Sequence, residues 1–250
     1  MERVVVGFDG SPASVAALHW ATARAALVPT AVDIVEVVQP SGRSGGGAVE
    51  TLAHLAQGAD LVVAGLDTGH PLRAALAGWV PWQLVADVEA AVCLVPADWT
   101  EGGDPVTVGI VDDSPRQPAL EFASRQARLT STGLRLVHSW LMPTPVARGS
   151  ATALGTTNEE PARHRRILDN AAERLAPQAV TMEILSELVR DTPSAALLSF
   201  SGHSSMLVLG THRRGPLSFA LLGSIVQDIL WRADCPVCVV PAGPEDATTL

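Results

Sequence analysis

Two short segments of the chain carry residue types that bind phosphate, ribose or adenine groups. The first, residues 112–115, reads Asp-Asp-Ser-Pro and follows an apolar run. The second begins at Gly210 and leads through two arginines to Gly223 and Ser224. Glycines let backbone N–H groups approach phosphate oxygens, and a helix that begins at Ser224 adds its dipole and its free N–H groups. Because an aspartate can accept hydrogen bonds from ribose or adenine, these residues predict a nucleotide site.

Each of these residues also has a purely structural explanation. Ser224 followed by Gln227 fits a capping box at a helix start. Arg213 either clamps phosphates through charge-assisted hydrogen bonds or lies on a solvated loop tip. Asp112 either contacts a ligand or caps the helix that follows it. The residues alone leave these alternatives open.

We find no further constellation in the sequence that supports catalysis or a metal site. Cys235 and Cys238 have the C-x-x-C spacing but enter a predicted strand, where their side chains point to opposite faces, so we interpret both as buried structural thiols. His138 and His212 are isolated from any set of metal-ligating residues. The sequence has neither a G-x-S-x-G elbow nor a P-loop with its lysine. We therefore expect no catalytic residues, no metal and no enzyme, with slow nucleotide hydrolysis left open.

An α/β sheet is needed to bring the two segments together. From residue 106 onward, apolar strand-like runs alternate with helix-like segments, beginning with a strand at 106–111 and a helix at 115–130. Further strands are expected at 134–140, 180–188, 206–211 and 236–240, and further helices at 159–175, 193–201 and 223–231. This alternation implies parallel strands with helices on both faces. In such sheets ligands bind outside the carboxyl ends of strands one and four. Here Asp112 follows strand one, and Gly210 lies at the end of strand four.

The chain also repeats itself. The segment at 62–65 recurs 145 residues later at 207–210, and the match continues without a gap to Pro96 and Pro241. The front segments at 9–12 and 112–115 match at a spacing of 103 residues, which is 42 residues shorter than the spacing of 145 found for the later segments. The first copy therefore lacks about one αβ unit, which would hold its second helix and third strand. We predict two domains, 1–97 and 106–242, that pack face to face as a pseudo-dimer.

Composition excludes several classes of function. The chain has 26 acidic and 17 basic residues and a net charge of −9, which disfavours nucleic acid as a partner. The sequence has no apolar run long enough to span a bilayer, so no membrane is expected. Hydrophobic residues make up 47% and Tyr is absent, which predicts a core of Val, Leu, Ile and Ala. Three cysteines without a recognisable export signal suggest reduced thiols and a cytoplasmic location.

Two segments resemble the universal stress protein family. VVVGFDGSPAS at 4–14 resembles the family's opening strand and turn, and CPVCVVP at 235–241 resembles its closing strand. The family's ATP-binding branch carries Gly, two residues, Gly, nine residues, Gly, then Ser or Thr. Gly210, Gly223 and Ser224 fit that spacing, and Arg213 replaces the second glycine. The resemblance covers nearly the whole chain, once per copy, and implies two Rossmann-like doubly wound parallel sheets of strand order 3-2-1-4-5.

The resemblance implies a regulatory protein of the stress response that binds an adenine nucleotide, ATP, in its second copy, with Mg²⁺ accompanying the nucleotide. The implied cofactor-binding residues are Asp112, Ser139, Leu209, Gly210, Arg213, Gly223, Ser224 and Ile225. Nucleotide occupancy would alter partner interactions or assembly, and a homodimer stays open. The alternative is a nucleotide-free interaction module with the same fold and a closed pocket. This alternative remains because Arg213 replaces the second glycine of the motif.

The first copy is expected to bind no nucleotide. Trp79 stands where the second copy has Ser224, which puts an indole where a phosphate would lie. Thr68 holds the second glycine position, and Asp67 adds negative charge beside it. Pro81 has no N–H to offer an anion. We therefore expect at most one nucleotide per chain.

Overall fold

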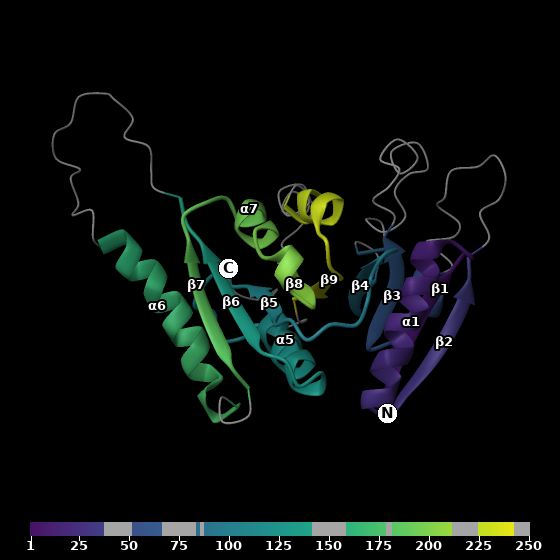
Figure 1. Cartoon of the computed structure of the whole chain (residues 1–250). Coiled ribbons are helices and arrows are strands. Elements are labelled where there is room, and N and C mark those ends of the chain that lie inside the picture. The colour runs from purple at the N-terminus through teal and green to yellow at the C-terminus, as the bar shows by residue number, and fades with distance from the viewer. Residues whose placement is uncertain are drawn as a thin grey trace.

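The strands of both copies form one continuous sheet in a computed structural model of the chain. The structure describes residues 1–37, 52–66, 84–85, 88–141, 159–178, 182–211 and 225–242. Within these ranges the sheet has nine strands in the order β2-β1-β3-β4-β9-β8-β5-β6-β7 (Figure 1). None of the helices in these ranges has both the length and the apolar character required to cross a membrane.

The first copy contributes four parallel strands. Its elements are β1 (Glu2–Phe8), α1 (Pro12–Leu27), β2 (Thr30–Glu36), β3 (Leu61–Leu66) and β4 (Ala91–Pro96). Numbered by position in the fold, their order β2-β1-β3-β4 is 2-1-4-5. β2 is the edge strand, and no described strand occupies the third position; residues 38–51, where the loss of one αβ unit is predicted, lie outside the described residues.

The second copy contributes five parallel strands in the order β7-β6-β5-β8-β9, which confirms the doubly wound order 3-2-1-4-5. Its strands are β5 (Val106–Gly109), β6 (Leu134–Ser139), β7 (Ile184–Val189), β8 (Met206–Thr211) and β9 (Val237–Pro241). Its helices are α5 (Pro118–Leu129), α6 (Glu159–Arg174) and α7 (Pro193–Leu198), with short 3-10 turns at Ala176–Gln178 and Ser201–His203. The third strand starts later than predicted because its pairing with β6 begins only at Ile184, opposite Leu134.

The two copies meet edge to edge, which corrects the predicted face-to-face packing. β4 and β9, the last strands of the two copies, pair antiparallel, with Cys93 opposite Cys238. The apolar edges of these strands therefore cover each other through backbone pairing, which satisfies main-chain groups that an open edge would leave exposed. The result is one sheet of two parallel halves joined by a single antiparallel pair.

The hydrophobic core lies in two layers, one on each face of the sheet. The α1, α5 and α6 helices cover one face, whereas α7 and the helical segments at 52–55 and 225–232 cover the other (Figure 1). Each core cluster contains residues of both copies, and Val, Leu, Ile and Ala make up most of it, as predicted from composition. The two copies therefore share their core on both faces of the sheet.

The α5 helix begins at Pro118 rather than at the predicted residue 115. Its N-cap is Gln117, which has φ −135° and ψ 79°. A residue that precedes proline is disfavoured in the helical region, so Pro118 prevents the helix from extending back through Gln117. In the first copy, Pro12 opens α1 directly after the N-cap Ser11. The loop after β5 is therefore longer than its counterpart after β1, and this difference shapes the site described next.

Candidate functional site

A pocket of about 380 Å³ lies at the carboxyl ends of β5 and β8, where the strand order of the second copy reverses. Its wall includes Asp112 on the loop after β5, Gly210 and Thr211 at the end of β8, and Gln117 and Ala119 at the start of α5. The pocket therefore combines carboxylate, amide and backbone groups with apolar surface. This is the position where open α/β sheets bind their ligands.

The two adjacent aspartates after β5 have different roles. Asp113 accepts hydrogen bonds from Asn170 at 2.7 Å and from Arg174 at 2.7 Å, both on α6, and the second contact is also an ion pair. Asp113 therefore anchors the loop to α6. Asp112 is exposed and lines the pocket, where its Oδ1 accepts the Ser114 N–H at 2.9 Å. Its other carboxylate oxygen has no hydrogen bond within the described part of the chain.

Gln117 is a pocket residue that sequence reasoning missed. As the N-cap of α5 it excludes the alternative in which Asp112 caps the helix. Its Nε2 donates to the Asp112 carbonyl at 2.8 Å, which holds the loop closed on itself. Its Oε1 is buried and has no hydrogen-bond partner among the described residues. A buried acceptor without a partner is costly, so this oxygen is suited to an N–H or O–H donor of a ligand. Proline at position 118 was the signal for this cap.

The equivalent aspartate of the first copy is held differently. Asp9 also accepts the N–H of the residue two positions on, Ser11, at 2.9 Å. Burial would raise the pKa of Asp9, but the polar groups at the start of α1, chiefly those of Ser11, outweigh burial and lower the pKa. Ser14 corresponds to Gln117: the Ser14 hydroxyl donates to the Ser11 carbonyl at 2.9 Å, whereas the Gln117 amide donates to the Asp112 carbonyl. Both aspartates are exposed, so the two copies differ here in the helix start that follows the aspartate.

Gly210 and its first-copy counterpart Gly65 both allow a helix to approach the sheet. A Cβ on Gly65 would lie 2.5 Å from the Ala13 carbonyl carbon and 2.6 Å from the Ser14 nitrogen, both in the first turn of α1. A Cβ on Gly210 would lie 3.3 Å from the Ala119 Cβ on α5. Helix packing therefore explains Gly65 fully and explains part of the need for glycine at 210.

The predicted cofactor-binding residues lie in several environments. Asp112 and Gly210 meet at the pocket wall. Leu209 is buried in the core beneath it, and Ser139 ends β6 beyond the pocket wall. Ile225 is in the helical segment at 225–232 and packs against the core. The other predicted residues of the site lie outside the described residues: Arg213, Gly223 and Ser224 of the second copy, and Asp67, Thr68, Trp79 and Pro81 of the first.

His138 is not isolated, as the sequence suggested, but belongs to a stacked cluster beside the pocket. Its Nδ1 donates to the Ile110 carbonyl at 2.7 Å, and its Nε2 lies 2.8 Å from Nδ1 of His164 on α6. The two imidazole rings stack at 5.0 Å, and Trp140 stacks on His164 at 5.5 Å. Because a carbonyl can only accept, Nδ1 of His138 carries the proton and its Nε2 accepts from His164. No local pattern could reveal this pair, since its members are on separate elements.

This buried histidine predicts that acid destabilises the fold. Burial lowers the pKa of His138, opposed in part by the Ile110 hydrogen bond and by Asp112. At pH values below about 6.5 the unfolded chain then binds more protons than the folded chain, so stability falls with pH. Urea titrations at about pH 7.5 and about pH 5.5 give the free energy of unfolding at each pH. The decrease in this free energy from the higher pH to the lower should be smaller for His138→Gln than for the unchanged protein. His54→Gln, on an exposed position, is the matched control; an equal pH dependence in all three proteins would contradict the assignment.

The cysteines have structural environments. Cys235 and Cys238 lie in the core clusters on opposite faces of the sheet, as their spacing predicted. Burial raises the pKa of Cys235 to about 12 and raises the pKa of Cys238 well above its ordinary value, so both remain thiols at neutral pH. Across the described part of the chain, no group of three or more His, Cys, Asp or Glu residues is arranged to hold a metal ion.

Known proteins are similar to this chain over most of its length. A family model described as the universal stress protein family matches residues 104–241. A universal stress protein of Mycobacterium tuberculosis is 25% identical and covers 96% of each chain. The crystal structure of a universal stress protein from Archaeoglobus fulgidus has a TM-score of 0.61 at 14% identity and covers 97% of each chain. Another from Archaeoglobus fulgidus, solved in complex with dAMP, covers 55% of this chain and 97% of its own, with 21% identity and a TM-score of 0.40.

Proposed function

Because this chain belongs to the universal stress protein family, we propose that it is a regulatory protein of the stress response whose second copy binds an adenine nucleotide, ATP. The observation that carries the proposal is the pocket at the switch point of the second copy, lined by Asp112, Gln117 and Gly210. Its volume of about 380 Å³ is within the range of sites that enclose small organic ligands. Nucleotide occupancy then alters partner interactions or assembly.

The polar groups of the pocket suit the nucleoside end of the ligand. Asp112 has an unused carboxylate oxygen among the described contacts, and Gln117 has a buried Oε1 without a partner. Both are acceptors, and ribose hydroxyls and the adenine amino group are donors. We assign phosphate binding to Gly210 and, from the spacing in the sequence, to Arg213, Gly223 and Ser224. Mg²⁺ would be held chiefly by the phosphates, as is usual for this ion.

The competing function is a nucleotide-free interaction module of the same fold. It is favoured by Gly210, whose packing against Ala119 gives the glycine a role without any ligand. The two functions differ in what the purified protein carries. After the purified protein is denatured, mass spectrometry of the supernatant should detect adenine nucleotide if the pocket is a nucleotide site. It should detect none if the pocket is closed.

We further propose that the nucleotide acts as a ligand and not as a substrate. Asp112 is the single carboxylate on the described wall of the pocket, and it already accepts a hydrogen bond from its own loop. The sequence offers no P-loop lysine to stabilise a transferring phosphoryl group. Phosphate release from bound ATP is therefore expected to be slow or absent.

Substitution of Asp112 should weaken ATP binding, whereas the same change at Asp9 should not. Loss of a charged hydrogen-bond partner costs about 1.5–3 kcal/mol, which is about 10- to 150-fold in affinity. Isothermal titration calorimetry on Asp112→Asn measures the loss while the Oδ1 acceptor for Ser114 is kept. Asp9→Asn is the matched control, because Asp9 makes the same turn with Ser11.

The same titrations give the stoichiometry, which we expect to be at most one nucleotide per chain. Two sites per chain, with one of them abolished by Asp9→Asn, would show that the first copy is a working site. Unchanged affinity in Asp112→Asn would remove Asp112 from the site.

A further inference from the structure

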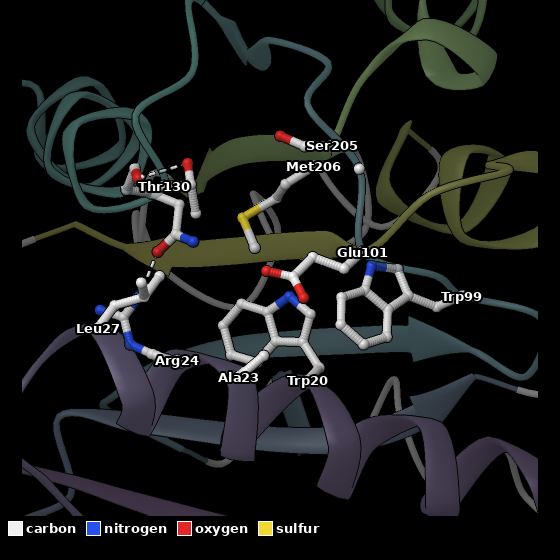
Figure 2. A pocket seen from close by; sticks show the side chains of 11 residues that line it. Trp20, Ala23, Arg24, Leu27, Trp99, Glu101, Thr130, Ser205 and Met206 are labelled. Atoms are coloured by element: carbon white, nitrogen blue, oxygen red, sulfur yellow. Dashed lines mark hydrogen bonds between the residues drawn. The ribbon is translucent and has the colours of Figure 1, made fainter.

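A second cavity, of about 110 Å³, lies at the junction of the two copies and apart from the pocket above. Its wall is built from α1 of the first copy, from the linker around residues 99–102, and from α5 and the start of β8 in the second copy (Figure 2). The cavity is therefore complete only when both copies are joined. It is too small for a nucleotide, and corresponds to fewer than four waters at about 30 Å³ each.

Aromatic and sulfur groups form much of the cavity wall. Figure 2 shows the indoles of Trp20 and Trp99 on one side and the Met206 side chain reaching toward the same space. Trp20 is 5% exposed and Trp99 is partly buried, so both rings are held by packing. The faces of indole rings carry negative charge density and attract cations, and the methionine sulfur is polarisable. Such a wall favours a cation with an apolar surface.

The charges at the cavity also favour a cation. Glu101 lines the cavity, and Figure 2 shows its carboxylate beside the Trp20 indole; it is exposed and forms no ion pair within the described residues. Asp98 and Asp104 flank it in a linker that has no Lys or Arg between residues 97 and 105. Of the described residues that line the cavity, Glu101 is the one carboxylate, so it supplies the negative charge at the mouth.

Arg24, the cation on the wall, is already compensated. Its guanidinium donates to both Glu2 carboxylate oxygens, at 2.7 Å and 2.9 Å, and its remaining arm donates to Gln126. It therefore has little capacity to bind an anion from solution. Ser205 adds a buried hydroxyl with no hydrogen-bond partner among the described residues, which suits a polar group of a ligand.

From these contacts we propose that the junction cavity binds a small methylated ammonium ion through Trp99 and Glu101. The Trp99 indole contacts the methyl groups and the Glu101 carboxylate neutralises the charge. Trp20, whose ring centroid lies 5.9 Å from the Arg24 guanidinium carbon, completes the apolar wall. A bare metal cation fits less well, because Ca²⁺ and Mg²⁺ require six or more oxygen ligands. Since the wall comes from both copies, a bound ion stabilises their junction by mass action.

Tetramethylammonium chloride added to the full chain tests the proposal. tert-Butanol has a similar shape without the charge, and sodium chloride at equal ionic strength controls for screening. We expect the melting temperature to rise with tetramethylammonium concentration, and calorimetry to show binding at least about tenfold tighter than tert-butanol. Equal binding of tert-butanol and tetramethylammonium would overturn the proposal, because it would show an apolar gap without charge recognition.

Three substitutions assign the binding to this cavity. Glu101→Gln and Trp99→Leu should each weaken tetramethylammonium binding at least about fivefold. Glu173→Gln, which neutralises an exposed carboxylate on α6, should leave it unchanged. Glu101 is exposed, so its variant tests the proposal even if Trp99→Leu disturbs the fold. ATP affinity should be the same in all three, which separates this site from the nucleotide pocket. Unchanged binding in Glu101→Gln would overturn the assignment.

Discussion

Arg24→Met is expected to lower the free energy of unfolding by about 3–5 kcal/mol. The Arg24 side chain is 3% exposed and pairs with Glu2, which is 13% exposed. It also donates to Gln126 on α5, so a single side chain of α1 ties the first copy to the second. Removing it leaves a nearly buried carboxylate without its counter-charge, which costs far more than the pair contributes. Urea unfolding monitored by circular dichroism measures the loss.

Two further variants isolate the cause of that loss. Arg24→Met combined with Glu2→Met removes both charges and should recover most of the stability, because a buried ion pair can be replaced by apolar groups at little net cost. Arg232 and Asp228 form an exposed ion pair with an N–O distance of 3.3 Å. Arg232→Ala breaks this pair and should lower the free energy of unfolding by no more than about 1 kcal/mol. If the double variant were as unstable as Arg24→Met alone, the loss would come from packing and from the bond to Gln126.

Gly65→Ala should be the second most damaging of the substitutions considered, at about 1–3 kcal/mol. The new methyl group would lie 2.5 Å and 2.6 Å from backbone atoms of Ala13 and Ser14. Backbone atoms cannot rotate away as a side chain can, so α1 would have to move off β3. Thermal or urea unfolding of the full chain checks the value.

Gly210→Ala is the matched control for that change, and it also tests the nucleotide site. Its methyl group would meet the Ala119 methyl at 3.3 Å, so a shift of a few tenths of an ångström suffices. The lower entropy of the unfolded alanine chain, about 0.4–1 kcal/mol, offsets much of the remaining cost. Stability should therefore change little. Weakened ATP binding in a stable Gly210→Ala variant would favour close phosphate approach at 210, whereas unchanged binding would leave helix packing as its role.

Much of the fold could be predicted from the sequence because its signals are local or repeated. Apolar runs and turn residues located β6, β8 and β9 to within one or two residues. The two repeat spacings predict a missing αβ unit between Pro40 and about Gly46, a segment outside the described residues. The strand order followed from general rules of parallel sheets. Asp112 follows one strand and Gly210 ends another at the same edge of the sheet, so the two residues were predicted to lie close together. Both line the pocket.

The tertiary structure decided the features that depend on contacts between distant elements. The sequence contains two apolar last strands, but their antiparallel pairing through Cys93 and Cys238 depends on how two sheet edges fit together. The sequence contains two adjacent aspartates, but Asn170 and Arg174 on α6 determine that Asp113 is the anchor. The same holds for the pair of His138 on β6 and His164 on α6, and for the cavity at the junction. Hydrophobic periodicity is a property of neighbouring residues, whereas ion pairs, ring stacking and cavities arise only where separate elements come within a few ångströms of one another.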